Sequence, residues 1–316
     1  MQYRNFGKSD LVTSVIGFGT WPMGRGMFGA FDEDEIARAV DLAIDGGVTL
    51  FDTAEVYGWG ASEELLGKLL RGKRDRVVLV SKGGTPWNES KNRSDRDSSR
   101  KQLTKALEGS LRRLQTDYLD LYLIHWPDES RPFSEPMEAL ADFQSQGKIR
   151  YGGVSNFSME QMRESLETFP IICNQVGYHL FDTRPEPEVF PFCRENGLGV
   201  MAYGPLAHGL LTGAMTPDTE FGPDDWRRNL VAFGQPLFEG EHFLNNLLKV
   251  DNLSEYASET GRTVAQLALA WVLSNPVVSV ALTGVRNPAE MEQNVEAADW
   301  LLSPEEREEV TALVAE

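Results

Sequence analysis

The chain has 316 residues, of which 41% are hydrophobic and 25% are charged, a composition that is typical of globular proteins and excludes disorder as the main state. Acidic residues outnumber basic residues by 48 to 30, and the resulting net charge of −18 disfavours nucleic acid and anionic membrane surfaces as partners. This charge does not exclude an anionic ligand that is held by a local cluster of cations.

Cysteine content and apolar runs predict the compartment. Cys173 and Cys193 are too few for a disulfide framework, and neither belongs to a CxxC pair, so a reducing environment is expected. The first ten residues lack the apolar run of a signal peptide, and the most apolar stretch, 264–285, is interrupted at Ser274-Asn275-Pro276. We therefore expect a cytoplasmic protein.

The chain opens with a predicted hairpin over residues 3–14 and continues as an alternation of short apolar runs and longer segments with helical spacing. The predicted strands are 15–17, 48–52, 77–82, 118–125, 149–155, 171–176, 199–203 and 277–283. The predicted helices are 32–45, 62–70, 98–114, 136–146, 158–168, 185–196, 264–274 and 288–298, with a final amphipathic segment at 304–315. This alternation is typical of parallel strands joined by crossover helices.

Two architectures compete for such a pattern, an open doubly wound sheet and a closed (β/α)8 barrel. Eight strand–helix units within about 280 residues favour the barrel. No linker, repeat or low-complexity segment is visible. We therefore predict a single barrel domain over residues 1–316, preceded by its hairpin.

One connection is much longer than the others. The excess lies between His208 and about Asn252 and is first rich in Gly, Pro and Asp and then helical. A long loop in a compact domain is usually a functional lid or a disordered insert. In a barrel this loop would lie on the carboxyl-terminal face of the strands.

A literal GxGxxG pattern spans Gly24 to Gly29, and Asp52 closes a strand 23 residues later. The dinucleotide fingerprint requires a helix N-terminus that attracts the pyrophosphate, but the following helix opens with Asp32-Glu33-Asp34-Glu35. These carboxylates would repel a diphosphate. We therefore reject a Rossmann interpretation.

Polar residues recur where the predicted strands end, and in a barrel such residues meet at one mouth. The six positions are Asp52, Lys82, His125, Ser155-Asn156, Asn174-Gln175 and Tyr203. Each alone is more often a solvated rim residue, but six such ends are hard to attribute to chance.

Asp52, Tyr57, Lys82 and His125 together offer a specific chemistry. A phenol is a weak acid with a reference pKa near 10, and we expect a neighbouring Lys82 ammonium to lower the pKa of Tyr57. Asp52 can hold Lys82, and His125 can hydrogen-bond a carbonyl oxygen. The set would protonate the oxyanion that forms when hydride reaches a carbonyl carbon.

Rival chemistries lack support in the sequence. The four histidines, at positions 125, 179, 208 and 242, have no HExxH spacing, and the chain has no GxSxG elbow. No metal site is expected.

Eight motifs, in order and spacing, resemble those of the aldo-keto reductase family, in the branch that also contains the potassium-channel β-subunits. They are GFGTW (17–21), FDTAEVYG (51–58), SK (81–82), LIHWPD (123–128), GVSNF (153–157), NQVGY (174–178), AYGPLAHGLLTG (202–213) and TGVRNPAEMEQN (283–294). The resemblance extends from Tyr3 to about Ala298. It implies a (β/α)8 barrel that uses NADP(H) without a Rossmann fold.

The resemblance also implies residue roles. Tyr57 would be the general acid, with Asp52, Lys82 and His125 completing a tetrad. Ser155, Asn156 and Gln175 would hold the nicotinamide carboxamide, and Tyr203 would stack on the ring. Arg286 would bind the 2′-phosphate, which suits a guanidinium. The remaining residues implied to bind cofactor are Gly19, Thr20, Trp21, Gly204, Leu206, Gly209, Gly284, Gln293 and Asn294.

Three positions depart from the family pattern. Glu290 stands where relatives often have a cation near the 2′-phosphate, which weakens the expectation of a strict NADP preference. Thr283 replaces a proline, and His208 stands where an arginine is common.

Trp21, Trp87 and Trp126 follow strands one, three and four and could either line the substrate pocket or pack at its rim. Trp271 and Trp300 are expected in the core, and both cysteines are expected to be buried.

These inferences predict an NADP(H)-dependent reductase of uncharged aldehydes or ketones, with NADP(H) preferred over NAD(H). The alternative is a cofactor-sensing subunit of a larger assembly. The reductase is favoured because the chain starts only a few residues before its hairpin and shows no long apolar or basic tract for a partner. The sequence does not define the oligomeric state.

Overall fold

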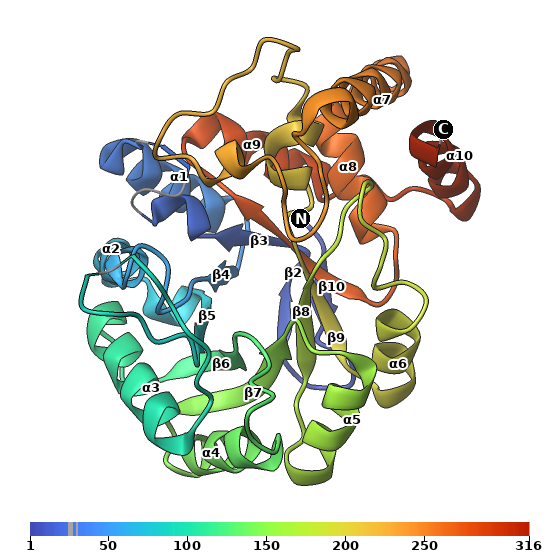
Figure 1. The fold of residues 1–316 in the computed structure, drawn as a ribbon. Coiled ribbons are helices and arrows are strands. Elements are labelled where there is room, and N and C mark those ends of the chain that lie inside the picture. Colours follow the sequence, from blue (N-terminus) through green and yellow to red (C-terminus); the bar gives the residue numbers. More distant parts are fainter. Residues whose placement is uncertain (25–27, 30, 91, 316) are drawn as a thin grey trace.

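A closed barrel of eight parallel strands forms the centre of the computed structural model, which describes residues 1–24, 28–29, 31–90 and 92–315 (Figure 1). The strands follow one another around the barrel in chain order, and β10 closes it against β3. The barrel strands are β3 (Ile16–Gly19), β4 (Leu50–Asp52), β5 (Val78–Gly83), β6 (Leu119–Ile124), β7 (Ile149–Ser155), β8 (Cys173–Gly177), β9 (Gly199–Tyr203) and β10 (Val278–Gly284). The predicted (β/α)8 fold is confirmed.

Helices surround the barrel, as predicted for crossover connections. They are α1 (Glu33–Asp45), α2 (Ala61–Leu69), α3 (Arg100–Leu114), α4 (Ser134–Ser145), α5 (Met159–Thr168), α6 (Val189–Asn196), α7 (Gly240–Glu259), α8 (Val264–Leu273), α9 (Pro288–Ala297) and α10 (Pro304–Ala315). Short 3-10 turns are η1 (Trp21–Met23), η2 (Arg74–Arg76), η3 (Ala207–Thr212) and η4 (Trp226–Asn229). Capping boxes at Ser158 and Thr263 start α5 and α8 by satisfying free backbone N–H groups.

Alternation along the strands divides the core into two layers. Leu50, Val80 and Leu121 belong to the cluster inside the barrel, whereas Phe51 and Tyr122 belong to the larger cluster between strands and helices. Successive side chains of a strand point to opposite faces, so each strand supplies both layers. A strand that is apolar on both faces is what a buried parallel barrel requires.

The predicted hairpin is formed by β1 (Tyr3–Asn5) and β2 (Val12–Ser14), which pair antiparallel. Its turn places Phe6 and Leu11 in the cluster inside the barrel, so it covers the amino-terminal end of the strands. Gly7 has a φ of 52°, and a Cβ there would lie 1.9 Å from the Gly197 carbonyl oxygen. The mouth at the carboxyl-terminal end of the strands is thereby left for function.

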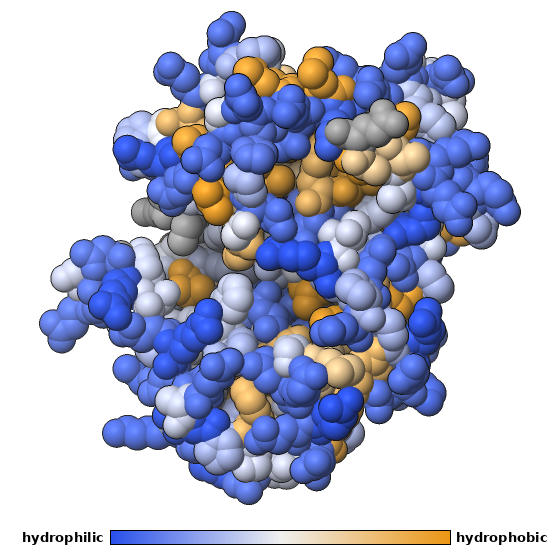
Figure 2. Space-filling view, turned by 45° about the vertical axis from the view of Figure 1, so that its right-hand side comes forward, coloured by the Kyte–Doolittle hydropathy of each residue, from blue (hydrophilic) through white to orange (hydrophobic). Residues whose placement is uncertain are grey.

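The long connection after β9 contains η3 and η4 and ends in α7, which extends beyond the predicted end of the helical part near residue 252. In Figure 1 this yellow-to-orange segment arches above α9. Hydrophilic residues dominate the surface in Figure 2, where hydrophobic side chains are recessed in a hollow in the middle of the face shown.

Several smaller expectations are also settled. Trp271 is fully buried, Trp300 is partly buried against the core, and Cys173 and Cys193 are buried free thiols. Among the described residues, no helix is long and apolar enough to cross a membrane.

Candidate active site

The polar residues at the strand ends meet at one end of the barrel, as expected. Asp52 closes β4 and Lys82 lies one residue before the end of β5, while His125 follows β6 directly. Ser155 closes β7 beside Gln175 of β8, and Tyr203 closes β9. Parallel strands in register bring these carboxyl-terminal positions together, and this is the face on which barrel enzymes carry their sites.

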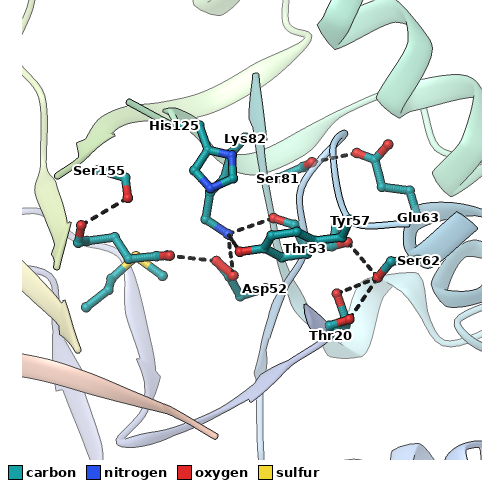
Figure 3. Close-up of polar contacts among 12 residues, drawn as sticks. Thr20, Asp52, Thr53, Tyr57, Ser62, Glu63, Ser81, Lys82, His125 and Ser155 are labelled. Carbon is teal, nitrogen blue, oxygen red and sulfur yellow. Dashed lines mark hydrogen bonds and ion pairs between the residues drawn. The ribbon is translucent and has the colours of Figure 1, made fainter. Parts of the chain in front are cut away.

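A buried lysine forms the centre of the site (Figure 3). Lys82 Nζ lies 2.5 Å from Asp52 Oδ2, and it donates hydrogen bonds of 2.9 Å to the Thr53 carbonyl oxygen and 3.3 Å to the Tyr57 hydroxyl. Lys82 is fully buried, so its three partners replace water around the ammonium. Asp52 is further held by Gln175, whose Nε2 donates to Asp52 Oδ1 at 2.8 Å.

Burial dominates the electrostatics of these groups. It lowers the pKa of Lys82 and raises the pKa of Asp52, and in both cases the attraction between the two charges opposes the effect of burial. Burial, and then the charge of Lys82, lowers the pKa of His125 well below its usual range. His125 is therefore a neutral imidazole at pH 7.

The pKa of Tyr57 corrects one expectation. We expected Lys82 to lower it, but burial and the nearby Asp52 carboxylate raise it well above the usual value of 10. Burial disfavours the phenolate more than one already paired ammonium favours it. Tyr57 therefore holds its proton at neutral pH. Its ring lies edge-on to that of His125, with the centroids 5.8 Å apart.

The residues implied to hold a carboxamide form a connected network beside this centre. Ser155 Oγ donates a hydrogen bond to the backbone carbonyl oxygen of Gln175 at 3.0 Å, and Asn156 Nδ2 donates one to Ser155 Oγ at 3.0 Å. Tyr203 donates its hydroxyl hydrogen to Asn156 Oδ1 at 3.0 Å, which fixes the orientation of its ring. Amide groups and a flat aromatic face are thus assembled at adjoining strand ends.

The glycine-rich turn after β9 adopts a backbone that favours glycine. Gly204 and Gly209 have φ values of 64° and 101°. Leu206 lies between these glycines in the chain and directly precedes η3. A Cβ on Gly204 would lie 3.0 Å from the His208 ring, and one on Gly209 would lie 3.0 Å from Arg227 Nη1. These glycines therefore let the turn pass close to the His208 ring and the Arg227 guanidinium.

The predicted residues at the end of β3 and just after it differ in their surroundings. Gly19 lies beside Gly284, its partner across the β3–β10 pair, and a Cβ on Gly19 would lie 3.1 Å from the Thr283 carbonyl oxygen. Thr20 is fully buried, and its hydroxyl accepts a hydrogen bond from Ser62. Trp21 stacks with Tyr57 at 6.3 Å between ring centroids.

Arg286 lies just beyond β10, about half exposed, and forms an ion pair with Glu290 of α9. On the same helix Gln293 is exposed, whereas Asn294 is buried. The three predicted residues therefore lie near one another, but only Arg286 and Gln293 are open to solvent.

The long connection contributes aromatic residues that the sequence analysis did not predict. The Phe233 ring lies 5.4 Å from those of Tyr203 and His208, 6.0 Å from that of Trp21 and 6.4 Å from that of Trp126. Trp226 stacks on Trp21 at 5.2 Å. Two of the predicted pocket tryptophans thus belong to one cluster.

Trp87 lies against Trp59 at 6.3 Å between ring centroids. Among the described residues, no ring contact joins this pair to the cluster around Tyr57. Trp87 is partly exposed.

A second polar group, which the sequence analysis also missed, lies behind Lys82. Glu63 is fully buried and accepts hydrogen bonds from Ser81 at 2.6 Å and from Arg113 Nε at 2.7 Å. Glu55, which lies between Asp52 and Tyr57 in the chain, is also buried. Its side-chain carboxyl group accepts a hydrogen bond from the Thr85 N–H at 3.0 Å. These contacts connect the segment that carries Tyr57 to the end of β5.

Gly24, Phe28 and Gly29 are the described residues of the GxGxxG pattern. Residues 25–27 lie outside the described residues, and α1 begins with Glu33, Asp34 and Glu35 after an Asp32 cap, as predicted. In addition, no group of three His, Cys, Asp or Glu suited to a metal ion is found among the described residues.

Comparison with known proteins identifies the class. Residues 15–315 match the Aldo/keto reductase family. The chain is 37% identical to the aldo-keto reductase YhdN of Bacillus subtilis (strain 168), covering 99% of this chain and 94% of that protein. It is 34% identical to a probable voltage-gated potassium channel subunit beta of Oryza sativa subsp. japonica, covering 99% and 97%.

Solved structures agree with this assignment. The glycerol dehydrogenase AKR11B4 from Gluconobacter oxydans superimposes with a TM-score of 0.89 at 36% identity, covering 99% of this chain and 95% of that one. An aldo-keto reductase from Klebsiella pneumoniae in complex with NADPH gives 0.78 at 35% identity, covering 99% and 96%. The chain belongs to the aldo/keto reductase family of oxidoreductases.

Proposed function

We propose that this protein is an NADP(H)-dependent reductase that converts uncharged aldehydes and ketones to alcohols, with Tyr57 as the general acid. The observation that carries the proposal is the contact of the buried Lys82 ammonium with the Tyr57 hydroxyl at 3.3 Å, at the barrel mouth. Family membership and the NADPH complex of the Klebsiella pneumoniae relative support the cofactor.

The donor set of the mouth fits a nicotinamide dinucleotide. Ser155, Asn156 and Gln175 would hold a carboxamide, and Tyr203 would support the flat ring. Gly204, Leu206 and Gly209 would border the pyrophosphate, and Gly19, Thr20, Trp21 and Gly284 would also contribute to cofactor binding. Arg286 would bind the 2′-phosphate, with Gln293 and Asn294 near the adenine. When bound, the reduced cofactor supplies a hydride to the carbonyl carbon.

The chain's own residues then have defined tasks. Tyr57 donates its hydroxyl proton to the substrate oxygen, and Lys82 stabilises the phenolate that remains. Asp52 keeps Lys82 charged and in place, which its 2.5 Å ion pair with Lys82 supports. The neutral His125 orients the carbonyl oxygen. The raised pKa of Tyr57 keeps the proton available at rest.

The pocket walls favour uncharged substrates. Trp21, Trp126 and Phe233 surround the approach to Tyr57 with aromatic surface, and such surface excludes water and binds apolar groups. The net charge of −18 further disfavours anionic substrates. Trp87 would border the pocket at its rim.

We also propose that residues 1–316 act as one catalytic domain, in the cytoplasm and without a nucleic-acid or membrane partner. The buried free thiols of Cys173 and Cys193 suit a reducing compartment.

The proposal is tested by Tyr57→Phe, which removes the donated proton and leaves the ring. We expect turnover to fall by at least about a hundredfold, the usual contribution of general acid catalysis. NADPH affinity, followed by tryptophan fluorescence, should barely change. Tyr3→Phe, at the hairpin end of the barrel, is the matched control and should keep full activity. If the Tyr57→Phe variant retained most of its turnover, the assignment would be wrong.

A second candidate function is sensing of the cofactor by a subunit of a larger assembly. The 34% identity to the rice channel subunit favours it, and a shared barrel does not separate the two functions. Rapid steady-state turnover would leave sensing as a secondary role at most.

A further inference from the structure

A carboxylate of the chain itself covers the guanidinium that would bind the 2′-phosphate. Glu290 Oε2 accepts the backbone N–H of Arg286 at 2.8 Å, and Oε1 accepts Nε and Nη2 of Arg286 at 3.2 Å and 2.8 Å. One side chain thus takes three donors that an oxyanion ligand would use. The two side chains are 50% and 31% exposed, so a ligand can reach them.

A second acidic residue lies near the same guanidinium. Asp225, which pairs with Arg227 at 2.6 Å, has a pKa below its usual value. Burial raises this pKa, but hydrogen bonds from Arg227 and the charges of Arg227 and Arg286 outweigh burial. Arg286 therefore faces Glu290 directly and Asp225 at longer range, and the excess positive charge that would select a phosphate is largely cancelled.

The two nicotinamide dinucleotides differ at this position. The 2′-phosphate of NADP must compete with the Glu290 carboxylate for Arg286, and it approaches a like charge. The 2′-hydroxyl of NAD carries no charge and can donate a hydrogen bond to a carboxylate, as it does to an acidic residue in Rossmann-type dinucleotide-binding proteins. The pair can therefore serve both groups, with Arg286 for the phosphate and Glu290 for the hydroxyl.

We propose that Glu290 makes NAD(H) a second cofactor of this protein by reducing discrimination at the 2′ position. The inference rests on the proposed function, because it concerns the same cofactor site. NADP(H) still binds more tightly through Arg286, but by a smaller factor than an uncovered guanidinium would give.

The test uses ligands that isolate the 2′ group. Titrations of NADP⁺, NAD⁺, 2′,5′-ADP and 5′-ADP, followed by calorimetry, give dissociation constants without turnover. For the wild type we expect NAD⁺ to bind less than about twentyfold more weakly than NADP⁺. The reason is that the exposed ion pair with Glu290 leaves Arg286 only about a tenfold electrostatic preference for the 2′-phosphate. A larger ratio overturns the inference.

The decisive variant is Glu290→Gln, which keeps the shape and removes the charge. We expect it to tighten 2′,5′-ADP about three- to fivefold, the upper part of the range for an exposed charge–charge contribution, and to change 5′-ADP less than about twofold. Glu292→Gln, an exposed glutamate on the same helix, is the matched control and should change neither. A smaller gain with Glu290→Gln, or an equal gain for both ligands, overturns the inference.

The two proposals fail in different ways. If NADP⁺ binds and NAD⁺ does not, the cofactor site stands and the role of Glu290 is wrong. If neither dinucleotide binds, the proposed function fails and this inference fails with it.

Discussion

The Lys82 ammonium contacts Asp52, Thr53 and Tyr57, and the buried carboxylate of Glu63 acts on it at longer range. Glu63 raises the pKa of Lys82 through its charge, although burial, the larger effect, lowers that pKa. Glu55 donates its backbone N–H to the Lys82 carbonyl at 3.2 Å. Burial, and then the charge of Glu63, raises the pKa of Glu55 to about 7, which the Thr85 N–H and Arg113 oppose only in part. Near neutral pH the folded protein therefore contains both protonated and ionised Glu55.

This pKa predicts a pH-dependent stability. The folded pKa of Glu55 lies above its unfolded value, so its contribution is fully present below about pH 4.5 and is lost as the pH rises through about 7. Glu55→Gln cannot ionise. We expect its free energy of unfolding, relative to the wild type, to improve by about 3 kcal/mol between pH 5 and pH 8, since one pKa unit corresponds to about 1.4 kcal/mol.

Urea unfolding at the two pH values measures this change. Glu64→Gln, at an exposed neighbour of Glu63 on α2, is the control and should follow the wild type. Parallel pH profiles for the wild type and Glu55→Gln would show that Glu55 ionises normally.

The long segment between η3 and α7 supplies the pocket wall that the barrel itself lacks. Its Phe233 has a φ of 48°, and its carbonyl accepts a hydrogen bond from Arg184 at 3.0 Å. Arg184 also forms an ion pair with the buried Asp182 at 2.6 Å. The loop after β8 thus holds the long segment against Tyr203 and the two tryptophans.

Removing the Phe233 ring tests its role in substrate binding. The side chain is 39% exposed, so Phe233→Ala costs little stability but opens the aromatic cluster. We expect kcat/KM for an aromatic aldehyde to fall about fivefold, corresponding to about 1 kcal/mol of apolar contact, and kcat/KM for a two-carbon aldehyde to change less than about twofold. Val231→Ala, 43% exposed on the same segment, is the control. Equal losses for both aldehydes would contradict the assignment.

The sequence pattern predicted the barrel strands that carry the site better than it predicted the segment between η3 and α7 that covers the site. Asp52, Lys82 and His125 could be placed together because strand register converts chain spacing into proximity. Phe233 could not be placed, since its position depends on an Arg184 contact 49 residues away in the chain. The pKa of Tyr57 was predicted with the wrong sign because the depth of burial is not visible in a motif.

At the scale of the whole molecule, a hydrophilic surface with a net charge of −18 surrounds a mouth built from buried polar groups and aromatic rings. The hairpin covers one end of the barrel, and the glycine-rich turn and long segment lie around the other. Such an arrangement confines chemistry to one face. Both the reductase and the sensing subunit would use the same bound cofactor, so the rate of turnover is what distinguishes the two functions.

The most direct test is NADPH oxidation, followed by absorbance, with a panel of uncharged aldehydes and ketones and their carboxylate-bearing counterparts. Steady-state and single-turnover rates are compared for each compound. We expect turnover of about 1 s⁻¹ or faster for at least one uncharged carbonyl, within the usual range for enzymes, and slower turnover for the carboxylates. A hydride-transfer step slower than about 0.1 s⁻¹ for every compound would contradict this expectation.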